Sequence, residues 1–300
     1  TGSVTVTFSG IDTEGLYPKV YHIDTDAQTA TDMEAKTEEN GDVTVDTNHF
    51  SLFLVQGQPF QELSGYVGDA FSGGGEFRLT GDAYTEQDGS SPILSITQNT
   101  TIDLNGHTLT ISKSGQYFDV HDGAKLTIMD SQAPQETVTD SGGTVYGNRA
   151  SLTDETLTYY ITESTPTGTG TMETLKKHEV TLTGAGKILC GEASAQAILV
   201  KGTLELQSGV LQNTGGQHIV TVDGGTLNVK DGYIVGGGRD GTPGGGIYVD
   251  NGEINISGGV IAANRGSSGG GIFFQSGTLN ISGGAVAGNE VINGHSDNGG

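Results

Sequence analysis

The chain has 300 residues, of which 51 are glycine and one is cysteine, and its formal net charge is −23 at pH 7. This acidity argues against binding to nucleic acid or to anionic membranes, because phosphate groups are bound by Lys and Arg. The single cysteine, Cys190, excludes an internal disulfide bond. No apolar run is long enough to span a bilayer, so we expect no membrane insertion within these residues.

Residues 1–62 are predicted to form a small antiparallel β-sandwich-like module. Segments such as "SVTVTFSG", "YPKVYHID" and "DVTVDTNHFSLFLV" alternate apolar and polar residues and are separated by polar links. We expect the module to be incomplete at its start. Residues 63–78 are predicted to be a linker and the cap of the next domain, because an open solenoid end exposes strand edges and core.

A repeat of roughly 25 residues dominates the rest of the chain. Four successive units begin with "GTLELQ", "GTLNVK", "GEINIS" and "GTLNIS", and weaker copies reach back to residue 79. Each unit has three short apolar runs between Gly, Asn and Asp residues, which is typical of strands joined by turns. We therefore predict an all-β chain whose residues 79–300 form a right-handed parallel β-helix of about eight coils, with three strands per coil.

Stacking of the coils predicts columns of equivalent residues. One column should point inward: Leu227, Ile254 and Leu279. Its neighbour should point outward as an amide ladder: Asn228, Asn255 and Asn280. A third column should lie at the turn after the second strand, where Asn tolerates the left-handed conformation and serves the structure: Asn148, Asn213, Asn264 and Asn289.

An insertion at about residues 131–180 interrupts the repeat. Two strand-like arms flank the turn-forming "STPTGTGT", which predicts a long hairpin or flap that projects from the rod. Such insertions often form the binding face of a solenoid, although a structural decoration is the alternative. The candidate ligand-binding residues in the arms are Tyr159, Tyr160, Lys176 and Lys177.

Tyr248 and Phe273 occupy equivalent positions in successive coils and should both face outward. Exposed aromatic rings at one strand spacing can hold a sugar ring or the side chain of a partner. They can equally stabilise each other as a ladder pair. We count them as candidate ligand-binding residues and leave both alternatives open.

Catalytic chemistry has little support in the sequence. Paired carboxylates of the kind that polysaccharide lyases and hydrolases use are not evident, and Arg239 and Arg265, two of only four arginines, lie in turns with no Lys two residues on. Asp119 and His121 are the weak candidates for an acid/base or metal pair, because both should point outward from one strand. We find no partner for them on the flanking coils, so a polar strand face is the alternative, and we predict a protein that is not an enzyme.

No metal site or cofactor is predicted with one exception. The acidic turns "VDGG" at Val222 and "VDNG" at Val249 offer carboxylate and carbonyl oxygens, which are the ligands that Ca²⁺ prefers. They lack the dense alternation of acidic residues in a dedicated calcium loop. A stabilising calcium ion is therefore kept as an option.

The chain resembles the parallel β-helix regions of Gram-positive cell-wall-anchored surface proteins, in the pectate-lyase-like superfamily. The resemblance rests on "VYHID…GDVTVDTNHFSLFLV" and on "LTGDAYTEQDGSSPILSITQNTTIDLNGHTLTIS". The coils are also similar to the repeats of polymorphic outer-membrane adhesins, through Gly245-Gly246-Ile247 and the segment "VIAAN" that ends at Asn264. The resemblance implies a secreted, extracellular protein on a bacterial surface, anchored through a region outside these residues.

The expected function is a monomeric adhesin that recognises an extracellular host ligand, either a glycoprotein such as a mucin or immunoglobulin, or a glycan. Two alternatives stay open. The first is a carbohydrate-active enzyme on the β-helix, either a polysaccharide lyase or a glycoside hydrolase. The second is a structural stalk.

Overall fold

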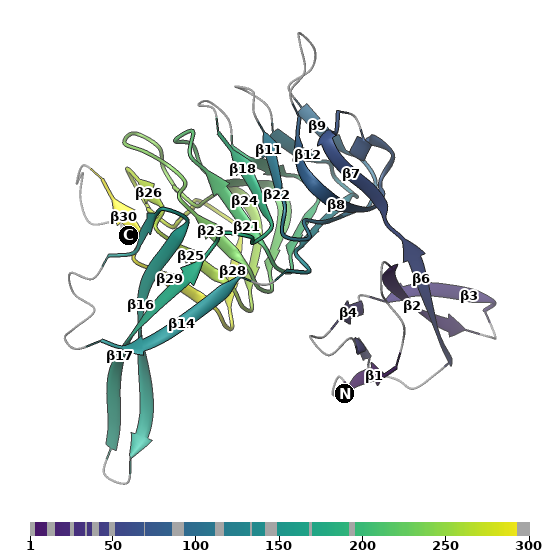
Figure 1. Cartoon of the computed structure of the whole chain (residues 1–300), viewed down its shortest axis with the longest axis horizontal. Coiled ribbons are helices and arrows are strands. Elements are labelled where there is room, and N and C mark those ends of the chain that lie inside the picture. The colour runs from purple at the N-terminus through teal and green to yellow at the C-terminus, as the bar shows by residue number, and fades with distance from the viewer. Residues whose placement is uncertain are drawn as a thin grey trace. The chain divides into compact units, whose positions relative to one another are not determined.

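The computed structural model describes the following residues, to which every structural statement here refers: 4–10, 16–24, 27–33, 35–37, 42–47, 52–68, 70–85, 93–111, 117–132, 134–141, 149–167, 170–191 and 196–292. These residues form strands and one short 3₁₀ turn, η1 (Ala70–Gly73), with no α-helix among them (Figure 1). The chain divides into two compact units, Thr1–Gln61 and Glu62–Gly300.

The first unit contains two three-stranded antiparallel sheets. One has the order β1 (Val4–Phe8), β5 (Val43–Thr47), β4 (Ala35–Thr37), and the other β3 (Thr29–Met33), β2 (Leu16–Asp24), β6 (Leu52–Pro59). Val20 of one sheet and Val43 and Val45 of the other are buried in one shared cluster. Two sheets that share an apolar core form a small sandwich, which is the architecture predicted for this region.

The second unit is a parallel β-solenoid in which three strand positions recur in every coil. The strands stack into three parallel sheets, which we call sheets 1, 2 and 3. Sheet 1 contains the start of β8 (Gly75–Tyr84), β10 (Thr100–Asp103), β13 (Lys125–Met129), β20 (Thr203–Leu206), the ends of β22 (Val220–Val229) and β24 (Ile247–Ile256), and β28 (Thr278–Ile281). Sheet 2 contains the end of β8, β11 (Thr108–Ile111), β18 (Lys187–Cys190), β21 (Val210–Asn213), β23 (Tyr233–Val235), β25 (Val260–Ala262) and β29 (Ala285–Ala287). Sheet 3 contains β9 (Ile93–Ile96), β12 (Tyr117–Val120), β19 (Ile198–Val200), the starts of β22 and β24, and β27 (Ile272–Phe274).

The described residues form about seven turns rather than the eight predicted. The segment "GGTVYGN" from Gly142 also has the rhythm of the repeat, and it lies outside the described residues. β18 pairs directly with β11, with Leu109 opposite Ile188, so no coil lies between these two strands. The inserted residues therefore leave the solenoid within one coil and return to the same coil.

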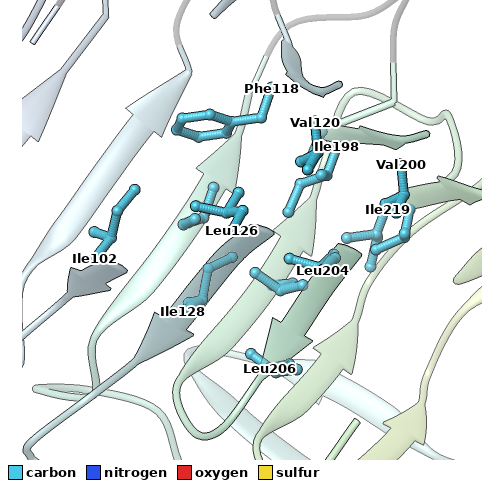
Figure 2. Close-up of a cluster of buried hydrophobic side chains, with 14 of the residues drawn as sticks. Ile102, Phe118, Val120, Leu126, Ile128, Ile198, Val200, Leu204, Leu206 and Ile219 are labelled. Carbon is cyan, nitrogen blue, oxygen red and sulfur yellow. The ribbon is translucent and has the colours of Figure 1, made fainter. Parts of the chain in front are cut away.

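The predicted inward and outward columns are confirmed. Leu227 lies opposite Ile254, which lies opposite Leu279 in sheet 1. Leu227 and Ile254 are fully buried, whereas Leu279, in the last described strand of this sheet, is 39% exposed. Figure 2 shows how side chains from successive coils, such as Leu126 and Leu204, meet inside the rod. Outside, the predicted amide ladder is present: Asn255 donates to Asn228 at 3.0 Å, and Asn280 donates to Asn255 at 2.8 Å.

The left-handed conformation at the turns after sheet 2 is adopted by a different residue from the one predicted. It falls on the residue before the Asn column, as at Ala263 (φ 55°) and Gly288 (φ 62°). Asn264 and Asn289 instead point their amides inward, where they bond to backbone groups of neighbouring coils. Their structural role was predicted correctly, while Asn148 lies outside the described residues.

The N-terminal end of the solenoid is covered by residues 62–68 and 70–73. β7 (Gln61–Tyr66) leads into η1, and the ring of Phe71 is buried against Phe77 (centroids 5.1 Å apart) and Phe118 (5.7 Å). Cys190 is buried in the core of the rod, as predicted. In the part of the chain that the structure describes, no helix has the length and hydrophobicity needed to cross a membrane.

The inserted residues form a four-stranded antiparallel sheet, which we call the inserted sheet. Its order is β14 (Gln135–Asp140), β17 (Gly170–Thr181), β16 (Thr156–Thr167), β15 (Ser151–Thr153). One face packs on the outer side of sheet 2 and forms a second apolar core, whose buried members are Leu157, Tyr159, Val180, Leu182, Ala185, Val210, Tyr233, Val235, Val260 and Ala262. The prediction of a projecting flap therefore holds only for the far ends of β16 and β17, which extend beyond the rod (Figure 1).

Candidate functional site

A groove of about 790 Å³ lies where the inserted sheet meets the turns that follow sheet 2. We call it the junction groove. β15 and its turn into β16 supply one side, and the turns after β21, β23, β25 and β29 supply the other. The groove thus follows four successive coils, which at the usual strand spacing is a length of about 14 Å. Its volume is in the range of ligand-binding clefts.

Part of the groove floor is bare backbone. Gly236, Gly237 and Gly238 lie between the turn of β21 and the turn of β25. A Cβ atom at Gly237 would collide with the carbonyl oxygen of Gly245, and Gly238 has a φ of +81°, so both positions require glycine. The N–H groups of Gly237 and Gly238 and the carbonyl oxygen of Gly237 are already bonded within the chain, so this floor is closely packed backbone.

One wall of the groove carries two arginines joined by a glutamate. Glu290 accepts a hydrogen bond from Nε of Arg265 through Oε2 at 3.1 Å. Its Oε1 is paired with Nη1 of Arg149 from the segment that precedes β15. The side chains of Arg149 and Arg265 are 72% and 57% exposed, so each still presents most of its guanidinium group to solvent.

Another part of the lining is the tight turn between β15 and β16. Asp154 and Glu155 both adopt positive φ, at 49° and 60°. Glu155 is paired with Lys187 of sheet 2, whereas the carboxylate of Asp154 has no hydrogen bond or ion pair with any described residue. Two basic and three acidic residues therefore line the groove, and the lysine that pairs with Glu155 lies outside the lining.

Tyr159 lies in the second apolar core rather than on the surface. Its side chain is 4% exposed, its ring is stacked on His178 at 4.6 Å, and its hydroxyl donates to Glu136 at 2.8 Å. Burial and this hydrogen bond raise the pKa of Tyr159. Tyr159 was predicted to bind ligand, but its strand face is the one that covers sheet 2, so its side chain is buried.

The two lysines of the inserted sheet are paired with acidic side chains. Lys176 bonds to Asp140, and this hydrogen bond raises the pKa of Lys176. Lys177 lies 2.8 Å from Glu179, opposite the half-buried Tyr160 on β16. The charges of both lysines are thus neutralised locally, and a direct role for these residues in binding stays a prediction.

Tyr248 and Phe273 face outward in register on sheet 3, as expected. Their rings are stacked, with centroids 5.5 Å apart and planes 9° apart. The ring of His218 covers the other side of Tyr248 at 5.0 Å. Because both faces of Tyr248 are occupied, this three-ring stack favours the stabilising alternative over sugar binding.

Asp119 points outward from β12 between the inward Phe118 and Val120, but it is only 6% exposed. Lys201 of the next coil lies 3.2 Å from its Oδ2, and Nε2 of His121 lies 3.6 Å from the same atom. Lys201 is a partner that sequence reasoning missed. Oδ1 of Asp119 is buried and bonds to none of the described residues.

Register places Asp119 and the aromatic stack in one outward column of sheet 3. The column runs through Asp119, Leu199, Thr221, Tyr248 and Phe273. Three coil spacings separate Asp119 from Tyr248, which is about 14 Å, so the two do not form one site. Among the described residues, no three His, Cys, Asp or Glu side chains cluster closely enough to hold a metal ion.

The junction groove was not predicted from the sequence. Its arginines come from distant segments, and only the packing of the inserted sheet on the rod brings them together. Two signals were visible: Arg265 directly after a repeat turn, and the run "GGG" where the next coil has "AAN". Neither indicates a groove without the position of β15.

Comparison with protein-family models, with curated proteins and with solved structures gives no match to this chain.

Proposed function

We propose that this chain is the recognition region of an extracellular, surface-displayed bacterial adhesin, and that the junction groove is where it binds its ligand. The ligand would be a host glycoprotein, such as a mucin or an immunoglobulin, or a glycan. The resemblance to Gram-positive cell-wall-anchored proteins supports an extracellular location on the bacterial surface. The acidic charge makes nucleic acid a poor partner.

The junction groove is the observation that carries the proposal. Its walls stand on two packed elements, the inserted sheet and the solenoid, which the second apolar core holds together. A binding site needs polar groups on such rigid supports, because ordering them on binding would otherwise reduce the affinity. Two exposed arginines and the free carboxylate of Asp154 meet this requirement.

A matched pair of variants tests the proposal. Ser151→Trp puts a large side chain on an exposed edge position that lines the groove, and Thr162→Trp puts the same side chain on an exposed position of β16 outside it. Deleting the inserted sheet would be less informative, because it would uncover Val210, Tyr233 and Val260.

The measurement is retention of mucosal components on the immobilised chain, with mass spectrometry of what is held. We expect a ligand that the wild type and Thr162→Trp retain and that Ser151→Trp loses. Equal retention by both variants would contradict the groove as the site. No retention by any of the three would instead favour the structural stalk.

A carbohydrate-active enzyme is the second candidate, because Asp119 is buried with one unbonded oxygen beside Lys201 and His121. A buried carboxylate next to a basic group is a common arrangement for proton transfer. Incubation with a panel of polysaccharides tests it, with Asp119→Asn as the control. Products that form with the wild type and not with this variant would establish the enzyme.

A further inference from the structure

We propose that the junction groove holds its ligand through a carboxylate carried by a sugar residue, with Arg149 and Arg265 as the groups that bind it. This inference rests on the proposed function and names the chemistry of the ligand at the same site.

Glu290 arranges the two guanidinium groups as a pair. One of its oxygens takes Nη1–H of Arg149 and the other takes Nε–H of Arg265. A guanidinium group has five N–H donors, so several on each arginine remain without a partner among the described residues. The two guanidinium groups and the one carboxylate between them have a net positive charge. This cluster, with its free donors, should bind one ligand carboxylate more tightly than a neutral group.

The pair is also distinctive within this chain. Only 13 of 300 residues are Lys or Arg, and four of these are arginine. The other two arginines do not line the groove, and Arg78 is held by the buried Asp103 at 2.7 Å. The net charge of −23 repels a polyanion, so the local charge fits a ligand with isolated carboxylates.

The rest of the groove favours a sugar over a peptide. Its exposed polar side chains can bond to hydroxyls: Ser151, Thr214 and the free carboxylate of Asp154. Few apolar side chains line it, and they are small or partly covered: Ala150, Leu152 and Ala263. A peptide of comparable length usually needs an apolar pocket for an anchoring side chain, and the lining supplies none of that size.

The test is calorimetric titration of the full chain with four probes: sialyllactose, the same sugar with its carboxylate converted to the amide, a disaccharide that ends in glucuronate, and an acidic peptide. We expect at least one acidic sugar to bind. For sialyllactose, conversion to the amide should reduce the affinity about tenfold or more, as expected for loss of a charge-assisted pair.

Arg149→Gln and Arg265→Gln should each remove most of the preference for the acid. Lys36→Gln removes one positive charge from an exposed strand of the first unit, and it should leave the preference for the acid unchanged. Equal affinity for acid and amide would overturn the inference, as would a preference that both arginine variants retain. Tighter binding of an acidic peptide than of any acidic sugar, or no binding of either acidic sugar at millimolar concentration, would overturn it as well.

These results are separable from those for the proposed function. A mucosal ligand that Ser151→Trp loses, but whose retention does not depend on its carboxylates, would leave the groove as the binding site and reject only the carboxylate. If Ser151→Trp retains the ligand as the wild type does, both the groove as the binding site and the carboxylate as the bound group are rejected.

Discussion

Asn264 and Asn289 occupy the same turn in successive coils, and both the backbone N–H and the side-chain amide of Asn264 donate to Oδ1 of Asn289 at 3.0 Å. The side chain of Asn264 also donates to the carbonyl of Ile234 and accepts from the N–H of Gly237. One buried amide thus connects three coils and supports the turn beside which the junction groove lies.

Replacing Asn264 with Ala should cost about 3 kcal/mol of unfolding free energy, because it leaves two backbone groups, the N–H of Gly237 and the carbonyl of Ile234, without partners. Asn280→Ala is the matched control. Asn280 makes one exposed amide bond to Asn255, so its loss should cost at most about 1 kcal/mol. Urea unfolding of both variants measures the difference, and equal costs would contradict the structural role of the turn.

Leu157→Ala should cost about 3 kcal/mol, because Leu157 is fully buried between the inserted sheet and sheet 2. Met172, on the exposed far end of β17, provides the comparison, and Met172→Ala should change stability by less than about 0.5 kcal/mol. Thermal or urea unfolding distinguishes them. A small effect at Leu157 would mean that the inserted sheet is not packed on the rod.

Tyr248→Thr should destabilise the chain by about 1 to 3 kcal/mol, since it removes the middle ring of the stack with His218 and Phe273. Thr keeps a strand-forming residue at this position. The same variant should retain the mucosal ligand as the wild type does. Lost retention in a variant that is still folded would restore the binding interpretation of these rings.

His218 should make stability depend on pH. Burial lowers its pKa below 6.5, and its Nδ1 lies 2.8 Å from the carbonyl oxygen of Pro243. Below pH 6.5 the unfolded chain therefore binds more protons than the folded chain, so the contribution of His218 is complete above pH 6.5 and decreases as the pH falls.

His218→Phe keeps a ring in the stack and cannot take up a proton. The unfolding free energy of the wild type relative to this variant should decrease from neutral to mildly acidic pH, as measured by urea titrations across that range. A constant difference between the two proteins would contradict the lowered pKa.

The solenoid was predictable because every coil needs apolar residues at the same positions, and this need repeats along the sequence. Leu227, Ile254 and Leu279 are apolar because each covers its neighbour, and this period is visible without a structure. The left-handed position was misassigned by one residue because Ala263 takes it, although Asn tolerates that conformation better.

The candidate site was not predictable for a different reason. Tyr159 has the same alternating pattern whether its face meets solvent or another sheet, and only the position of sheet 2 decides that it is buried. The pairing of Arg149 and Arg265 through Glu290 likewise depends on how the inserted sheet docks. Local sequence patterns do not contain that information.

Amide hydrogen exchange with and without the retained mucosal ligand tests the central claim most directly. The account predicts slower exchange in three segments that lie apart in the sequence and together in the groove: residues 149–155, 236–238 and 263–265. Exchange that slows on sheet 3 around Tyr248, with these segments unchanged, would contradict the junction groove as the site of recognition.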